Sequence, residues 1–466
     1  MSKLEDLTRI GQLENSVVIS DMNRKQSQNM STAKSRFELW ESLRIRGDCL
    51  VSFQFRSAIE RTSTRDSAER TITQVAAGET LKANAKSQSL LTGGREAMGH
   101  SRRDEARRDA MPRGRWFHLL LITVFVFAGS TSRTFAQCRS PQTVAEQLAS
   151  AYGHRLEQVS YISALPLVAK LEMTEILGET RFASEVRLIM EPFRTGKKSP
   201  VPKSGSEQAG HLIFAALAHR SSGAERERWI ALCRSAADQI FDDSGKALDA
   251  MPFHSEMSDA VFMAGPILAV TGKLTGDRRY FDAAAIHLAS MRTFCLREDG
   301  LYRHSPLCDA AWGRGNGFAA LGLALSLSEW PDDHPAFEPL LKEFRKHIAA
   351  LKPLQDSRTH CWHQVIDHPE SYNEYSCTCM IAFSMARGIR RGWLDREDYQ
   401  SNIDRAWLAI ESRTNANGDL TNVCTGTGKQ KTLQDYFDRP AINGKDDRGG
   451  AVGLMFAVEL ISSNQP

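Results

Sequence analysis

Side chains that could transfer a proton or hold an anion gather in four segments of the chain. These segments are residues 254–259, 304–318, 362–376 and 432–450. The first ends in Asp259, and a carboxyl group held away from water can act as a general acid and base. The second contains Trp312 and Arg314, which supply an aromatic face and a guanidinium fork for a sugar that carries a carboxylate. The four segments together predict a site for an acidic ligand.

The elements that must position these segments are helices, arranged in a unit that recurs five times. In each unit an apolar helix rich in small residues is followed by a polar turn and then by an amphipathic helix that opens with an aromatic residue. The aromatic residues are 47, 51, 57 and 62 positions apart, which is typical of stacked helix pairs. The turns lie at residues 178–182, 223–229, 275–280, 332–337 and 395–399.

The apolar helices are apolar nearly all round, which indicates that they are enclosed on every side. They are His211–Ala218, Val261–Val270, Phe318–Leu327, Cys379–Ala386 and Ala451–Val458. The amphipathic partners would form an outer layer around them.

Two unpaired helices decide between a ring and an open stack. Ala451–Val458 has no outer helix after it, and Thr143–Tyr152 has no inner helix before it. Pairing the first helix with the last predicts an all-α fold, an (α/α)6 toroid of six inner and six outer helices. An open solenoid, the alternative, would need capped ends. In the toroid the four segments meet at the N-termini of inner helices, where free N–H groups favour an anion.

Four motifs resemble the unsaturated uronyl hydrolases of glycoside hydrolase families 88 and 105, the second more closely. The similarity extends from about Gly210 to Glu459, and the string from Trp312 to Gly317 is its most specific part. The motifs are Asp259-Ala-Val-Phe-Met263, Asp299-Gly-Leu-Tyr-Arg-His304, Trp312-Gly-Arg-Gly-Asn-Gly317 and Glu374-Tyr-Ser376. The resemblance implies an (α/α)6 barrel, in agreement with the repeats. It also implies oligosaccharide substrates left by polysaccharide lyases and ending in a 4,5-unsaturated uronic acid, typically linked to rhamnose.

The chemistry that the resemblance implies is hydration of a vinyl ether. An acid protonates carbon 4, water adds at carbon 5, and the resulting hemiketal opens and releases the neighbouring sugar. Asp259 matches the family's catalytic aspartate and is our candidate for general acid and base. The alternative is that Asp259 only caps the N-terminus of the inner helix that follows it.

Five further residues are candidates for binding the substrate, each with a structural alternative. His304 matches a substrate-site histidine of the family, and a buried structural histidine is the alternative. Trp312 would stack on the sugar ring or pack in the core. Arg314 would meet the carboxylate or hydroxyls of the sugar or form an internal ion pair. Asn316 would bind substrate or only shape a turn, and Glu374 would bind substrate, cap a helix or pair with Arg314.

Two residues beside Asp259, His254 and Glu256, are candidates for substrate contact or for support of Asp259.

One feature departs from the family pattern. The family has a second acidic residue at the start of an earlier inner helix, and residues 204–211 contain no aspartate there. Glu207 is a possible substitute.

Two other functions stay open at this point. An inverting glycosidase of the same fold would need a second carboxyl group facing Asp259, and Glu374 and Glu207 are the candidates. A non-catalytic sugar-binding or scaffold protein would need no acid there. None of these functions calls for a metal or organic cofactor.

The segment Met111–Ala136 has a basic start, a short apolar stretch and a small-residue cleavage site, which predicts a signal peptide and a periplasmic or secreted protein. We therefore expect residues 1–110 to be a disordered extension or an incorrect start, 111–136 to be removed, and 137–466 to form the catalytic domain. A single membrane anchor is the alternative, but the apolar stretch is short for a span, so we expect no stable span in the mature protein.

The charge distribution agrees with this division. Residues 1–137 carry a net +7 and residues 138–466 a net −4, which give the formal charge of +3. Because the basic excess lies outside the expected domain, no nucleic-acid partner is implied.

Eight of the nine cysteines follow Ala136, and none forms a Cys-x-x-Cys pair, so we expect structural cysteines and no zinc site.

Overall fold

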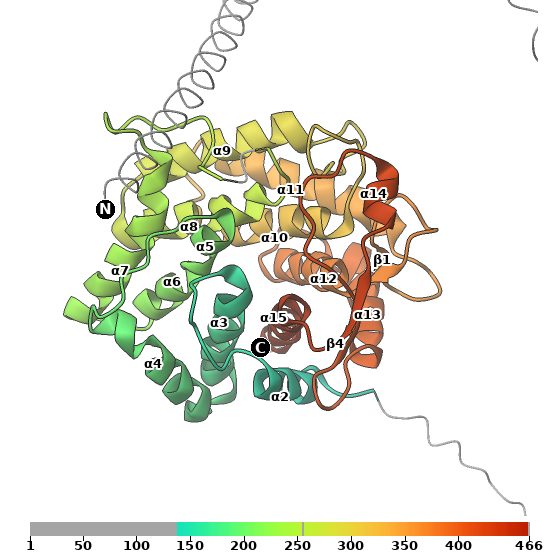
Figure 1. Cartoon of the computed structure of the whole chain (residues 1–466), viewed down its shortest axis with the longest axis horizontal. Helices are drawn as coiled ribbons and strands as arrows, with labels where there is room; N and C mark the ends of the chain where they lie inside the picture. The colour runs from blue at the N-terminus through green and yellow to red at the C-terminus, as the bar shows by residue number, and fades with distance from the viewer. Residues whose placement is uncertain (1–137, 254–255, 465–466) are drawn as a thin grey trace, which may run out of the picture. The chain divides into compact units, whose positions relative to one another are not determined.

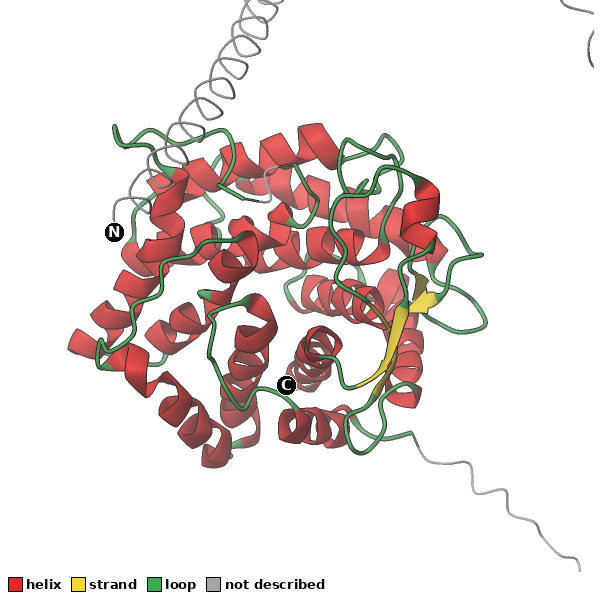
Figure 2. Cartoon of the chain, viewed as in Figure 1, coloured by secondary structure: helices red, strands yellow, loops and turns green. Residues whose placement is uncertain are grey.

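The computed structural model describes residues 138–253 and 256–464, and these form two concentric layers of α-helices with four short strands (Figure 2). The predicted extension and signal peptide fall on residues 1–137, which lie outside the described residues. In the part of the chain that is described, no helix is long and apolar enough to cross a membrane.

The inner layer is a closed ring in which each helix contacts the next (Figure 1). Its members in order are α3 (Tyr161–Leu177), α5 (Gly205–Gly210) with α6 (Leu212–His219), α8 (Ala260–Thr275), α10 (Gly313–Glu329), α12 (Tyr375–Arg390) and α15 (Asp447–Ser463). The contact of α15 with α3 closes the ring.

The outer layer has one helix for each inner position. Five outer helices pack on the inner helix that precedes them in the chain, and α2 packs on α15. They are α4 (Thr180–Arg194), α7 (Gly223–Ala237), α9 (Arg279–Cys295), α11 (Phe337–Leu351), α13 (Arg396–Ser412) and α2 (Pro141–Ala151). The first helix therefore completes the last hairpin, and the predicted helical toroid is confirmed for the described residues.

Burial explains why the two layers differ in sequence. Every residue of α8 is buried except Lys273 and Thr275, because the helix has neighbours on all sides. The outer helix α11 buries one stripe, including Leu340, Phe344 and Ile348, and exposes a charged face. An enclosed helix has no face to present to water, so it is apolar and small all round.

One inner helix differs from its prediction. The expected helix His211–Ala218 begins earlier and is interrupted at His211, which separates α5 from α6. A Cβ atom on Gly210 would lie 2.7 Å from the carbonyl carbons of Val159 and Ser160. The glycine therefore allows α5 to approach the segment that leads into α3, a long-range contact with no local signature.

Short elements complete the end of the ring where the inner helices begin. Two antiparallel hairpins lie there, with Trp362 opposite Glu374 in the first and Cys424 opposite Ala441 in the second. Their strands are β1 (Trp362–His363), β2 (Asn373–Glu374), β3 (Leu420–Cys424) and β4 (Ala441–Gly444), and the small helices are α14 (Leu433–Phe437), η1 (Asp238–Ile240) and η2 (Lys352–Leu354).

The interior of the ring is filled just below this end. Tyr161, Phe262 and Phe318 come from three inner helices, and their ring centroids lie 5.4–5.7 Å apart. Toward the other end Glu459 of α15 pairs with Arg387 and Arg390 of α12 at 2.6 and 2.9 Å. The candidate site therefore has a packed aromatic floor and is no open channel.

Candidate active site

Asp259 lies directly before α8, with a side chain that is only 7% exposed. It occupies the N-cap position, but its carboxylate makes no capping hydrogen bond to the helix. Its Oδ2 atom lies instead 3.0 Å from Nε2 of His304. The N–H of Ser258 donates to the His304 carbonyl at 3.0 Å, which holds the two links together. The geometry therefore does not support capping as the role of this carboxyl group.

His304 is fully buried and contacts three functional groups. Besides Asp259, its Nδ1 atom lies 2.9 Å from the hydroxyl of Tyr436 in α14. The Trp312 ring packs against it, with centroids 4.4 Å apart. The imidazole is thus held between the carboxyl group and a tyrosine.

The glycines of the Trp312–Gly317 string allow α10 to approach the neighbouring links. A Cβ atom on Gly313 would lie 2.5 Å from the His363 carbonyl oxygen. One on Gly315 would lie 2.6 Å from the Ser258 hydroxyl. A Cβ atom cannot lie so close to these atoms without a shift of the structure. Glycine at both positions therefore permits the start of α10 to pack against the neighbouring links, including the segment that contains Asp259.

Trp312 itself is 1% exposed and packs against His304 and Arg314. Its surroundings in the described residues are those of a core side chain, with Val365, Cys424 and Tyr436 in the same apolar cluster. Its stacking on a sugar ring stays a prediction, since such contact needs an uncovered ring face.

Arg314 is a buried cation without an ion pair among the described residues. It donates to the carbonyls of Cys424, at 2.7 Å, and Thr425, and it lies over the Trp312 ring at 5.1 Å. Burial alone would lower its pKa, but Cys424, Tyr161, Glu374 and Asp259 more than offset this and raise it. A guanidinium held by carbonyl oxygens retains its full charge for an anion.

Asn316 is fully buried and holds backbone groups together. Its Oδ1 atom accepts from the Tyr302 N–H at 2.8 Å, and its Nδ2 atom donates to the carbonyls of Tyr302 and Trp312 at 2.8 and 2.9 Å. These bonds fix the residues that lead to His304 on one side and to Arg314 on the other. A contact of Asn316 with substrate stays a prediction.

Glu374 caps α12 from a fully buried position. Its carboxylate accepts from the N–H groups of Ser376 at 2.9 Å, Cys377 at 2.6 Å and Cys424 at 2.9 Å, and from the Ser376 hydroxyl. The capping alternative is therefore the role that the geometry shows, and contact with substrate stays a prediction.

The remaining predicted residues lie at the margin or outside the described part. His254 is not among the described residues. Glu256 is exposed and pairs with Lys429 at 2.7 Å. Glu207 accepts from the Gln158 side chain at 2.6 Å and from the Lys203 N–H at 2.9 Å, so its carboxylate ties two loops together.

Two residues in this region were missed from the sequence. Tyr161 begins α3, and burial raises its pKa to about 12, while Arg314 and Asp259 also act on it. Its place at the start of an inner helix is the signal that could have identified it. Tyr436 had no such signal, because α14 is a single short turn of helix within a link.

The described residues contain no group of three or more His, Cys, Asp or Glu side chains placed to hold a metal ion.

The eight cysteines after Ala136 are free thiols, and most are buried. Burial raises the pKa of Cys295 to about 12, which keeps its thiol neutral beside the candidate site.

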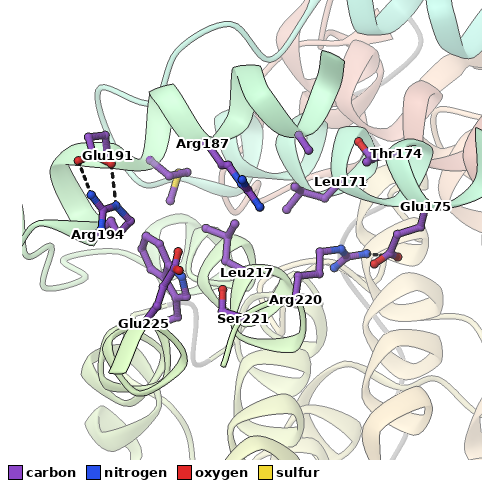
Figure 3. A pocket seen from close by; sticks show the side chains of 13 residues that line it. Leu171, Thr174, Glu175, Arg187, Glu191, Arg194, Leu217, Arg220, Ser221 and Glu225 are labelled. Atoms are coloured by element: carbon purple, nitrogen blue, oxygen red, sulfur yellow. Dashed lines mark hydrogen bonds and ion pairs between the residues drawn. The ribbon is translucent and has the colours of Figure 1, made fainter. Parts of the chain in front are cut away.

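A separate cleft of about 460 Å³ lies between the hairpins α3–α4 and α6–α7 (Figure 3). Its rim includes ion pairs of Arg220 with Glu175 and of Arg194 with Glu191. Because Glu175 and Arg220 lie at the C-terminal ends of inner helices, this cleft is at the opposite end of the ring from Asp259. It is therefore not the predicted site.

Comparison with known proteins tests the family resemblance. The model of Glycosyl Hydrolase Family 88 matches residues 161–463, from the first inner helix to the last. The chain belongs to Glycosyl Hydrolase Family 88. The family match covers Asp259, His304, the string from Trp312 to Gly317 and Glu374, which are the positions that the fold brings to the mouth of the ring.

Curated relatives of this family member carry related names. The chain is 28% identical over 224 residues to an unsaturated rhamnogalacturonyl hydrolase of Bacillus subtilis, covering 45% of the chain and 60% of that protein. It is 29% identical over 175 residues to an unsaturated 3S-rhamnoglycuronyl hydrolase of Formosa agariphila, covering 33% of the chain and 45% of that protein. The matches thus span about half the length of the curated relatives.

Solved structures show the same fold. A possible member of family GH105 from Salmonella enterica aligns with a TM-score of 0.59 at 18% identity, over 69% of this chain and 93% of that one. A second from Klebsiella pneumoniae gives a TM-score of 0.60 at 18% identity, over 75% and 99%. At 18% identity, this likeness establishes only the fold of the family 88 chain.

Proposed function

We propose that this family 88 protein removes a terminal 4,5-unsaturated uronic acid from lyase-generated oligosaccharides by hydrating the vinyl ether double bond. The observation that carries the proposal is the buried carboxyl group of Asp259, which lies 3.0 Å from His304 and does not cap its helix. A carboxyl group that is buried at such a cost beside a histidine is a candidate catalyst.

The proposed reaction needs one carboxyl group that both gives and takes a proton. Asp259 in its acid form donates its proton to carbon 4 of the unsaturated ring. A water molecule then adds to carbon 5 and gives a proton back to the carboxylate, so the enzyme returns to its starting state. The product is a hemiketal, which opens and releases the neighbouring sugar without further catalysis by the chain.

Recognition of the uronate would come from fixed positive charge. Arg314 supplies a buried guanidinium that no carboxylate of the described residues neutralises in an ion pair. The N-termini of α8, α10 and α12 meet at the same end of the ring and add their partial positive charges. Both features favour an anionic ligand at this end over a neutral sugar.

The rival reaction, inversion at a saturated glycosidic bond, needs a second carboxyl group to activate water. Glu374 is engaged by three backbone N–H groups, and Glu207 holds two loops. Neither arrangement favours this rival, and we prefer hydration. A non-catalytic role would leave the burial of Asp259 beside His304 unexplained.

The finer parts of the proposal rest on the relatives and the sequence. Both relatives described above are named for rhamnose-containing substrates, which supports rhamnogalacturonan-type lyase products as the first class to test. The predicted leader at residues 111–136 supports export to the periplasm or outside the cell. A cell fractionation with mass spectrometry of the N-terminus tests the second point.

The test of the reaction is loss of ultraviolet absorbance near 235 nm from the conjugated double bond. Purified protein is incubated with unsaturated products of rhamnogalacturonan, ulvan, pectin and glycosaminoglycan lyases. We expect at least one to lose absorbance, and Asp259→Asn to lower kcat by about a thousandfold or more, since it removes the proposed proton donor. Asp243→Asn, the same change at an exposed loop position, should retain activity. No loss of absorbance with any substrate would refute the proposal.

A further inference from the structure

Tyr436 is a buried tyrosine whose hydroxyl contacts His304 of the candidate site. It belongs to α14, in the link between β3 and β4, and is 0% exposed. Its hydroxyl lies 2.9 Å from Nδ1 of His304, on the opposite side of the imidazole from Asp259. The three side chains therefore form a row, with the imidazole between a carboxyl group and a phenol.

The position of Tyr436 is fixed by bonds on several sides. The Gln364 side chain donates to its carbonyl at 2.8 Å. A capping box between Thr432 and Asp435 closes the start of α14. The His304 end is fixed as well, since its N–H donates to Ala310 and its carbonyl accepts from Ser258. The distance between the two side chains is thus set by the backbone.

The hydrogen bonds of the Tyr436 hydroxyl decide which of its partners can donate. The N–H of Gln430 donates to this oxygen at 3.4 Å, so one acceptor position is used. Among the described residues, Nδ1 of His304 is the acceptor within reach of the single O–H hydrogen. Burial raises the pKa of Tyr436 well above its usual value, so the hydroxyl keeps this hydrogen at neutral pH.

If His304 carried its proton on Nδ1, this N–H would donate to the Tyr436 oxygen, and the buried O–H of Tyr436 would be left without an acceptor. An unsatisfied buried donor costs about 1–3 kcal/mol. With the proton on Nε2, the O–H of Tyr436 donates to Nδ1 and the Nε2 hydrogen lies on the side of Asp259. The second arrangement keeps the buried O–H of Tyr436 bonded and places the Nε2 hydrogen beside the Asp259 carboxylate, at an N···O distance of 3.0 Å that is not aligned as a hydrogen bond.

We propose that Tyr436 is a positioning residue that fixes the tautomer of His304, with its proton on Nε2 and facing the carboxyl group of Asp259. This inference rests on the proposed function for its consequence in catalysis. A neutral imidazole in this tautomer stabilises the carboxylate form of Asp259 after it has given its proton to carbon 4. The opposite tautomer would present a lone pair to that carboxylate and oppose the transfer.

Other ionisable groups act on this row from neighbouring elements. Arg314, Tyr161, Cys295 and Cys308 interact electrostatically with members of the row, and Arg303, Glu256 and Lys429 act on Cys295. The phenol of Tyr161 and the thiol of Cys295 stay neutral, since burial raises the pKa of each to about 12. Glu256 and Lys429 neutralise one another at 2.7 Å. Tyr436 is the group in direct contact with Nδ1.

The direct test is the nitrogen-15 NMR spectrum of the full chain labelled at histidine. The signals of His304 are identified by their loss in His304→Gln. We expect a protonated Nε2 and an unprotonated Nδ1 in the wild type, and a mixture of tautomers in Tyr436→Phe. A Tyr436→Phe protein with the same single tautomer as the wild type would overturn the inference.

The catalytic test is the pH dependence of kcat and kcat/KM on the substrate found active. Tyr436→Phe should lower kcat about tenfold, as expected for one buried hydrogen bond, change KM little and move the pH profile. The matched control is Tyr280→Phe, which removes a partly buried hydrogen bond, 2.5 Å long, from Tyr280 in outer helix α9 to Asp238. The control should retain both kcat and the profile.

The outcomes separate the two proposals. If Tyr436→Phe behaves as Tyr280→Phe does, Tyr436 has a structural role only and the inference fails, while the proposed function stands. If the wild type hydrates no unsaturated uronide, the proposed function fails, and the nitrogen signals still decide whether Tyr436 sets the tautomer.

Discussion

Replacement of Glu374 by glutamine separates a structural role from contact with substrate at a residue for which the sequence left both open. The carboxylate is fully buried and accepts from Ser376, Cys377 and Cys424. Glutamine has nearly the same shape but offers one acceptor oxygen, and its amide group places hydrogens opposite backbone N–H groups. Glu374→Gln therefore removes bonds without creating a cavity.

The size of the effect follows from the bonds that are lost. Loss of an N-cap costs about 1 kcal/mol, and leaving the buried N–H of Cys424 without an acceptor costs about 1–3 kcal/mol more. We expect the free energy of unfolding to fall by about 2–4 kcal/mol. Urea unfolding followed by circular dichroism at 222 nm measures this change.

The matched control is Asp395→Asn at the N-cap of outer helix α13. Asp395 accepts from the Glu397 N–H, at 2.8 Å, and is exposed. Because asparagine caps as well as aspartate, its cost should stay below about 0.5 kcal/mol. The reasoning on Glu374 would be refuted by a loss under about 1 kcal/mol together with a raised KM, since that result indicates contact with substrate.

Two further predictions concern the packing and the protonation of the site's supports. Gly313→Ala should destabilise the fold by about 1–3 kcal/mol in urea unfolding, because its Cβ would lie 2.5 Å from the backbone carbonyl oxygen of His363. Unchanged stability would contradict this close approach of the two backbones. His287 is buried between the Met251 N–H and the Ala260 carbonyl, and burial lowers its pKa to about 4. Since the unfolded chain binds this proton near pH 6.5 and the folded chain does not until about pH 4, up to about 3 kcal/mol of stability is lost as the pH falls through this window. His287→Gln, which can make both bonds, should remove that slope, and a slope that persists would contradict the assignment.

The ring could be predicted from the sequence because its signals are local. Small residues all round a helix, polar turns and the opening aromatic residues repeat within each hairpin, and the unpaired first and last helices indicated closure. The interruption at His211 was not predicted, and neither was the approach of Gly210 to Val159 and Ser160, about 50 positions earlier. Contacts of that range leave no periodic pattern.

The candidate site could be predicted in part for the same reason. Asp259, His304 and Arg314 stand at the starts of inner helices or in the links before them, so their types and positions indicated the mouth of the ring. The role of Glu374 could not be decided, because one of its donors, the Cys424 N–H, lies 50 positions away. Tyr436 was missed since its partner His304 is 132 positions away and α14 has too few residues for a pattern.

The charges around the mouth link ligand binding to proton transfer under the proposed function. The described site contains the carboxyl groups of Asp259 and Glu374 and the guanidinium of Arg314. Arg314 interacts electrostatically with both carboxyl groups. A uronate adds a further negative charge to a region from which water is largely excluded. Electrostatic repulsion then favours uptake of one proton by the site, and the carboxylate of Glu374 already accepts from three backbone N–H groups. Under the proposed function, Asp259 is then the group that takes the proton. The binding of an acidic substrate would therefore protonate Asp259, and this proton is the one that carbon 4 requires.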